Sequence, residues 1–216
     1  MQIVVVLYPR FTALDIAGPY DVLGRLPGAE VVFVAEERGL VPNENGELSF
    51  LATASFDEVT HPDLVLVPGG PGTKEQLAPD GPLVRWLRAV DPHTTWTTSV
   101  CSGSLVLAAA GFLKGSPATS HWKVTGLLPL FGAEPASERV VEAGKYITAA
   151  GVSSGIDMAL TLAGRIAGDT DAQAIQLAVE YDPQPPYDAG SPAKAAPEVH
   201  AAFTAREGAL IGGERD

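Results

Sequence analysis

Short apolar runs alternate with amphipathic stretches along this chain, in the order typical of a parallel sheet whose strands are joined by helices. The first run, residues 3–8, is continuously apolar, as expected for a strand covered on both faces. Strands are predicted at residues 3–8, 30–35, 63–67, 94–100, 118–120 and 146–149. Helices are predicted at residues 16–26, 83–90, 104–111, 121–130, 155–167 and 171–179. Strands that alternate with helices form right-handed βαβ units, so the pattern predicts an α/β fold with a single doubly wound, mostly parallel sheet.

Two segments depart from that alternation. Residues 39–56 alternate weakly and contain Asn-Glu-Asn-Gly, which indicates a β-hairpin. Residues 181–197 are rich in Pro, Ala and Gly, and are interpreted as an ordered arm before a short terminal helix, although a solvated tail has the same composition. We therefore expect an α/β domain at residues 1–180, with residues 181–216 forming an arm and a short helix of the same domain.

The composition limits the classes of partner. A chain of 216 residues, 46% of them hydrophobic, can bury one sizeable core. Its formal net charge of −12 argues against nucleic acid or an anionic membrane as a partner. The longest apolar stretch, residues 105–113, is far too short to span a bilayer.

Cysteine and histidine usage narrows the compartment and the chemistry. One cysteine permits no internal disulfide, and residues 1–7 lack the basic start of a secretory signal, so a cytoplasmic protein is expected. Four scattered histidines and a single cysteine do not make a metal-binding pattern, so no metal is expected.

That single cysteine, Cys101, lies at the sharpest strand-to-helix junction that the pattern predicts. Small residues stand two positions to either side, at Ser99 and Gly103, which is the spacing of a nucleophile elbow. Unpaired N–H groups and the positive end of a helix dipole favour the thiolate there. A lone cysteine is also commonly a small buried hydrophobe, but the flanking pattern favours a catalytic nucleophile.

Two other segments follow strands at the same carboxyl edge of the predicted sheet, where active sites of such folds lie. Asp15 follows the first strand; it is either a helix N-cap or an acid/base group beside the thiolate. Two neighbouring anions disfavour each other, so in the second interpretation Asp15 holds a proton that it can donate to a substrate. Gly69 and Gly70 follow the third strand and form either an ordinary turn or, with the Ser102 amide, an oxyanion hole.

Two polar side chains near these segments are weaker candidates. The Ser102 hydroxyl either satisfies the local backbone or binds a substrate atom or orients Asp15. His121 is interpreted as a packed structural residue rather than a general base. His200 has no glutamate two residues later, so a Cys-His-Glu triad of the glutaminase kind lacks its late members.

With these motifs in place the chain resembles the ThiJ/PfpI superfamily, and within it the branch of isonitrile hydratases (cyclohexyl-isocyanide hydratases). The segment rich in proline is what points to this branch. The matching stretches are residues 14–23, 67–70, 98–107, 118–122, 148–157 and 180–192.

The resemblance implies a homodimer of flavodoxin-like domains with the nucleophilic cysteine at the elbow. Cys101 matches the nucleophile and Asp15 its acidic partner, and the backbone near Val152 is expected beside the thiolate. The branch usually carries threonine after the cysteine, where this chain has Ser102, which keeps the hydroxyl group and loses the methyl group. Relatives that act as peptidases carry histidine at that position, and deglycase or glyoxalase relatives carry glutamate where this chain has Asp15.

The function that the resemblance implies is hydration of an isonitrile to an N-substituted formamide through a thioimidate on Cys101. A small-molecule substrate, no cofactor and no metal are expected. An apolar substituent of that substrate would suit a cleft lined by Tyr20 or Trp122, both of which are equally plausible as core residues. The alternatives are a glyoxalase or deglycase of the same superfamily, and a redox sensor that oxidises Cys101 without turnover.

Overall fold

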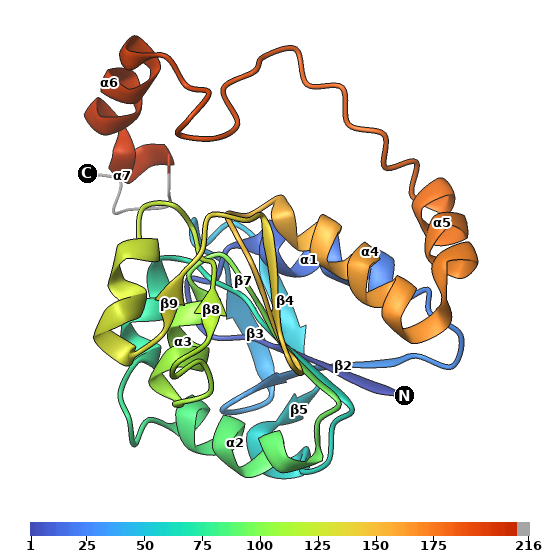
Figure 1. The fold of residues 1–216 in the computed structure, drawn as a ribbon. Coiled ribbons are helices and arrows are strands. Elements are labelled where there is room, and N and C mark those ends of the chain that lie inside the picture. The colour runs from blue at the N-terminus through green and yellow to red at the C-terminus, as the bar shows by residue number, and fades with distance from the viewer. Residues whose placement is uncertain (211–216) are drawn as a thin grey trace.

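A seven-stranded sheet with helices on both faces forms the centre of the molecule (Figure 1). The structure, a computed structural model, describes residues 1–210, with side chains through residue 208. The sheet order is β10-β11-β7-β6-β1-β2-β5, and all neighbouring pairs are parallel except the antiparallel pair β10–β11. The strands of this sheet are β1 (Gln2–Val6), β2 (Glu30–Ala35), β5 (Ala54–Ser55), β6 (Leu64–Val67), β7 (Trp96–Val100), β10 (Val140–Ala143) and β11 (Tyr146–Ala149).

The helices form two layers around the sheet. On one side α1 packs against α4, and α4 packs against α5; on the other side α2 and α3 lie together. The helices are α1 (Ala13–Leu23), α2 (Pro82–Val90), α3 (Gly103–Ala109), α4 (Ser154–Ala167), α5 (Asp169–Ala178), α6 (Pro197–Ala205) and α7 (Glu207–Leu210). None of the described helices combines the length and the apolar character needed to cross a bilayer.

The central strands explain why the functional segments meet. In β1 and β6 nearly every side chain is buried, as the apolar runs in the sequence predict for strands covered on both faces. Because β1, β6 and β7 are parallel neighbours, their carboxyl ends reach the same edge of the sheet. The segments that follow these strands, which carry Asp15, Gly69 and Cys101, therefore start side by side.

The predicted α/β class and the doubly wound, mostly parallel sheet are confirmed. The hairpin predicted within residues 39–56 is also present, as β3 (Gly39–Pro42) paired antiparallel with β4 (Ser49–Ala52). The division into residues 1–180 and residues 181–216 stays a prediction, and residues 211–216 lie outside the described part of the chain.

One local prediction is wrong, one strand is displaced from its predicted bounds, and one strand was missed. Residues 121–130 do not form an α-helix; Thr125–Phe131 is a 3₁₀ helix that contains Pro129, which has no N–H to donate. The strand predicted at residues 118–120 is β8 (Pro117–Ala118), which pairs with β9 (Glu134–Pro135) outside the main sheet. The edge strand β10 was not predicted, because four residues with alternating burial are too short to give a clear periodic signal.

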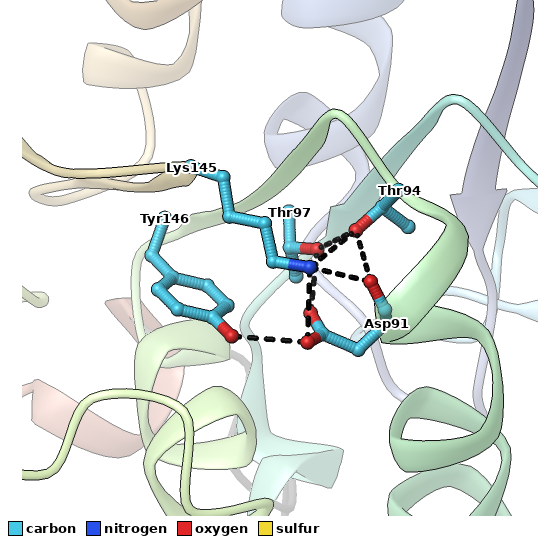
Figure 2. A network of polar contacts seen from close by, with 5 residues as sticks. All are labelled: Asp91, Thr94, Thr97, Lys145 and Tyr146. Atoms are coloured by element: carbon cyan, nitrogen blue, oxygen red, sulfur yellow. Dashed lines mark hydrogen bonds and ion pairs between the residues drawn. The ribbon is translucent and has the colours of Figure 1, made fainter.

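At the amino ends of β7 and β11 a polar network ties the sheet to the preceding turn (Figure 2). Asp91 is its centre: one carboxylate oxygen pairs with Lys145 Nζ at 3.0 Å and accepts the Tyr146 hydroxyl at 3.0 Å. The other carboxylate oxygen accepts the Thr97 hydroxyl at 3.2 Å, and the Thr94 hydroxyl lies between Thr97 and Lys145. The network is far from Cys101 along β7, so its contribution is to stability.

Replacing Lys145 with methionine is expected to lower the free energy of unfolding by about 1–2 kcal/mol, because it removes the cation beside a mostly buried carboxylate. Chemical denaturation measures this value. Lys114→Met is the matched control, since it removes the same charge from an exposed side chain. Equal stability of the two variants would show that the network does not stabilise the fold.

Candidate active site

Cys101 occupies a sharp turn directly after β7. Its φ angle is 57°, in the left-handed region that residues other than glycine rarely adopt. Hydrogen bonds on both sides hold this conformation: its N–H donates to Ala150 O at 2.8 Å, and its carbonyl accepts the Ser120 hydroxyl at 3.0 Å and the Ser104 hydroxyl at 3.3 Å. The geometry is that of the predicted nucleophile elbow.

The elbow requires a residue without a side chain at Gly103. A Cβ atom there would lie 2.4 Å from the carbonyl oxygen of Val67 and 2.6 Å from that of Pro68. The first turn of α3 therefore approaches the end of β6 as closely as a glycine allows.

Gly103→Ala is expected to destabilise the protein by about 2–3 kcal/mol, because backbone atoms must shift to admit the methyl group. Unfolding in denaturant measures the loss. Gly126→Ala is the control, since a Cβ atom at Gly126 would meet nothing within 4 Å. If both variants were equally stable, the close approach at Gly103 would not constrain the turn.

The sulfur of Cys101 is shielded from water but not sealed in the core. Cys101 is 6% exposed and lies in the wall of a cavity of about 750 Å³. The backbone N–H groups of Val152 and Ser102 form hydrogen bonds to the sulfur. Val152 has a φ of 23°, which is strained for a β-branched residue. The residue in this strained conformation is one of the two whose N–H points at the sulfur.

Burial sets the protonation of Cys101. Burial is the largest influence on the thiol and raises its pKa; the nearby charge of Asp15 raises it further. The two N–H groups and the Ser102 hydroxyl, which also forms a hydrogen bond to the sulfur, lower it. The sequence predicts a thiolate stabilised by the helix dipole, whereas in the structure the pKa of the thiol is raised rather than lowered. An ionised Asp15 further disfavours a second negative charge on the sulfur.

Asp15 is the third residue of α1 and is completely buried. Thr12 occupies the N-cap position, so the interpretation of Asp15 as a helix cap is wrong. Its Oδ2 accepts the Gly69 N–H at 2.8 Å, its Oδ1 has no nitrogen or oxygen partner, and the carboxyl group interacts with the Cys101 thiol. Burial raises the pKa of Asp15 to about 8. A neutral carboxylic acid therefore lies beside the sulfur at neutral pH.

The amides of the turn after β6 are already engaged within the protein. The Gly69 N–H donates to Asp15, and the Gly70 N–H donates to Ser102 Oγ at 3.0 Å. Neither amide is free for a substrate oxygen, which differs from the predicted oxyanion hole. The two glycines position the side chains of Asp15 and Ser102, and the N–H groups that face the sulfur are those of Ser102 and Val152.

Ser102 belongs to a buried chain of hydroxyl groups that the sequence analysis missed. Its Oγ lies 2.8 Å from Thr73 Oγ1, which lies 3.1 Å from the Tyr8 hydroxyl, and the latter donates to Pro68 O at 2.6 Å. Ser102 therefore does not orient Asp15. The signal that could have found Tyr8 and Thr73 is their position, since each closely follows a strand at the carboxyl edge.

The walls of the cavity in front of Cys101 are mostly apolar. Neither Tyr20 nor Trp122 lines it, so that prediction is wrong for both; each is more than two-fifths exposed, at 43% and 42%. Nor is either a core residue. The apolar side chains that line the cavity are Pro71, Leu77, Leu105, Val124, Leu127, Val152 and Phe203.

His121 also lines the cavity, but its contacts fit a structural residue. Its Nδ1 accepts the Lys123 N–H at 3.3 Å, and burial lowers its pKa, so the ring is neutral at pH 7. It is not among the groups that influence the pKa of Cys101. Within residues 1–208, no three His, Cys, Asp or Glu side chains converge as metal ligands.

Known proteins match this chain along most of its length. The model of the DJ-1/PfpI family matches residues 1–165. Isonitrile hydratase from Pseudomonas putida is 43% identical over 192 residues, which cover 89% of this chain and 83% of that protein. The crystal structure of a ThiJ/PfpI family protein from Pseudomonas syringae has a TM-score of 0.91 and 37% identity, with coverage of 98% of this chain and 87% of that one.

A more distant relative represents another activity. Deglycase PfpI from Pyrococcus furiosus is 26% identical over 150 residues, which cover 68% of this chain and 89% of that protein. The resemblance seen in the sequence motifs is thus confirmed by whole-chain similarity and by the fold. The chain belongs to the DJ-1/PfpI family.

Proposed function

We propose that this protein hydrates isonitriles to N-substituted formamides, with Cys101 as the nucleophile and Asp15 as the proton donor. The observation that carries the proposal is a neutral, buried carboxyl group in contact with a thiol at the wall of an apolar cavity. The 43% identity to an isonitrile hydratase supports the same assignment.

The first step needs a proton and a nucleophile at the same carbon. The Asp15 carboxyl group donates its proton to the terminal carbon of R–N≡C as the Cys101 thiolate attacks that carbon. A C–H bond and a C–S bond form, and the carbon–nitrogen triple bond becomes a double bond. The product is a thioimidate, R–N=CH–S–Cys101, beside an ionised Asp15.

The second step returns the enzyme to its starting state. The Asp15 carboxylate accepts a proton from water while the hydroxyl group adds to the thioimidate carbon, and it passes that proton to the nitrogen. The tetrahedral intermediate R–NH–CH(OH)–S–Cys101 then collapses: the C–S bond breaks, the thiolate leaves, and the hydroxyl proton moves to Asp15. The sulfur and the carboxyl group account for every bond change, so the scheme requires no cofactor.

The ionisation of the pair fits this sequence of steps. Each negative charge raises the pKa of the other group, so the pair holds at most one charge near neutral pH. The N–H groups of Ser102 and Val152 stabilise that charge when it lies on the sulfur. The proposed reactive form of the singly charged pair is a thiolate next to a protonated Asp15.

The remaining parts of the assignment are also proposals. We propose that the substrate carries an apolar substituent, because the cavity walls are apolar. We further propose that the protein is a cytoplasmic homodimer, a proposal supported by its single cysteine and by the resemblance of its motifs to the superfamily.

The test is incubation of the purified protein with cyclohexyl isonitrile and detection of N-cyclohexylformamide by mass spectrometry. Methylglyoxal in a parallel assay addresses the deglycase or glyoxalase alternative. Turnover of methylglyoxal without any formamide would replace the proposal with that alternative. Turnover of neither substrate, with selective peroxide oxidation of Cys101, would replace it with a redox sensor.

A further inference from the structure

The far end of the chain builds part of the wall of the cavity in front of Cys101. Phe203 in α6 and the residues Glu207 and Gly208 in α7 line the cavity together with the sheet edge. In Figure 1 the extended segment after α5 runs beyond the carboxyl edge of the sheet and leads to α6 and α7. Residues distant from Cys101 in the sequence therefore limit the space in front of it.

The two terminal helices contact the body of the protein at one loop. Lys123 Nζ pairs with Glu207 Oε2 at 3.0 Å, and the side chains are 32% and 33% exposed. The Trp122 ring packs against the Phe203 ring with centroids 5.3 Å apart, and Lys123 Nζ lies 5.7 Å from the centroid of Phe203. No residue of α6 is buried, so the attachment depends on surface contacts that are individually weak.

The chemistry of this wall selects for apolar groups. Phe203 lines the same cavity as Leu105, Val124 and Leu127. Glu207 neutralises Lys123, which would otherwise present a positive charge at the rim. A group bound there exchanges water for hydrocarbon contacts, which favours an uncharged apolar substituent.

We propose that Phe203 and the Lys123–Glu207 ion pair are specificity-determining: Phe203 sets the size of the apolar group that reaches Cys101, and the ion pair holds Phe203 in place. This deepens the proposed hydratase activity and rests on it for the identity of the reacting group. The wall itself acts on any molecule that approaches the sulfur, so it can be tested without turnover.

The test compares the rates at which N-methylmaleimide and N-cyclohexylmaleimide alkylate Cys101, the only cysteine of the chain. Intact-mass spectrometry follows the reaction, and the ratio of the two rates cancels the effect of Cys101 ionisation. Phe203→Ala is expected to raise the ratio of the N-cyclohexylmaleimide rate to the N-methylmaleimide rate at least about fivefold, since the missing side chain widens the passage. An unchanged ratio in Phe203→Ala overturns the proposal.

The ion pair is tested with a matched pair of variants on the terminal helices. Glu207→Gln is expected to raise the same ratio about two- to threefold, because exposed ion pairs hold a segment only weakly. Glu198→Gln removes an equal charge from an exposed position of α6 and should leave the ratio unchanged. High salt should raise the ratio in the wild type but not in Glu207→Gln, because salt screens only the intact pair. If the two variants give the same ratio, or if salt changes the ratio equally in the wild type and in Glu207→Gln, the ion pair does not hold Phe203 in place.

The specificity proposal and the hydratase proposal fail separately. With isonitriles, Phe203→Ala should raise kcat/KM for the cyclohexyl compound relative to that for the methyl compound, because the wider passage admits the larger group. If the maleimide ratio responds but the wild type forms no formamide, the wall is supported and the hydratase assignment is lost. If the wild type forms formamide and the ratio does not respond, the hydratase assignment is supported and the role of the wall is lost.

Discussion

Replacing Cys101 with alanine is expected to reduce formamide production to the background rate, a loss of at least about 10⁴-fold. The proposed route passes through a bond between the substrate carbon and this sulfur, and no other cysteine exists to take its place. The measurement is the initial rate with cyclohexyl isonitrile, determined with equal amounts of folded wild type and variant.

Two further observations make this expectation decisive. Stopping the wild-type reaction with acid during turnover should trap protein whose mass has increased by one substrate molecule, and Cys101→Ala should show no such species. The variant should unfold within about 1 kcal/mol of the wild type, because the sulfur is a small group at a cavity wall and its loss leaves little new void. A Cys101→Ala protein that still hydrates the isonitrile at a comparable rate would eliminate the covalent route.

Replacing Asp15 with asparagine is expected to lower kcat by about 10²–10⁴-fold, the usual contribution of a positioned acid. The amide has the shape of the carboxyl group and can accept the Gly69 N–H, but it cannot supply the proton that the substrate carbon requires. Asp21→Asn is the control on the same helix, since Asp21 is exposed and pairs with Arg25 on the surface of α1. It should leave both rate and pH profile unchanged.

The pH profile follows from the sign of the shift at Asp15. Its pKa in the folded protein is about 8, raised from 3.8, so both groups of the pair are protonated well below pH 8, and the pair acquires its single negative charge as the pH rises through that value. The wild-type rate should therefore rise as the pH rises through about 8, and the residual rate of Asp15→Asn should lack this rise. A wild-type profile that stays flat or falls as the pH rises through about 8 would remove Asp15 from the role of proton donor.

The same shift predicts a change in stability that does not depend on turnover. Between about pH 4 and pH 8 the folded state holds a proton on Asp15 that the unfolded state has released, so wild-type stability falls as the pH rises. Asp15→Asn lacks this contribution. Its free energy of unfolding, relative to that of the wild type, should therefore increase by up to about 1.4 kcal/mol per pH unit over this range. Denaturant titrations at several pH values measure the difference.

Much of the fold could be predicted because its signals are local. Residues 30–35 form a strand in both the prediction and the structure, and the small residues around Cys101 predicted a turn that the φ of 57° bears out. Where local signals compete, the prediction failed: residues 121–130 have helical periodicity, but Pro129 withholds a donor and the segment forms a 3₁₀ helix. An edge strand as short as β10 offers too few residues for any periodic pattern.

The sequence predicted where the candidate site lies, but not which groups form hydrogen bonds within it. Cys101, Asp15 and the glycines after β6 follow neighbouring parallel strands, so topology alone brings them to one edge. The partners of the two glycine amides were misassigned, because they depend on side chains from α1 and from the elbow.

The sequence by itself determined the α/β class, the order of the central elements and the position of a single cysteine at a strand-to-helix turn. Only the tertiary structure decided the protonation of Asp15, the hydrogen-bond donors to the sulfur, and the wall that Phe203 adds to the cavity. The physical reason is that periodicity and turn chemistry arise between neighbours along the chain. Desolvation and access depend instead on every atom packed around a group, whichever part of the chain supplies it.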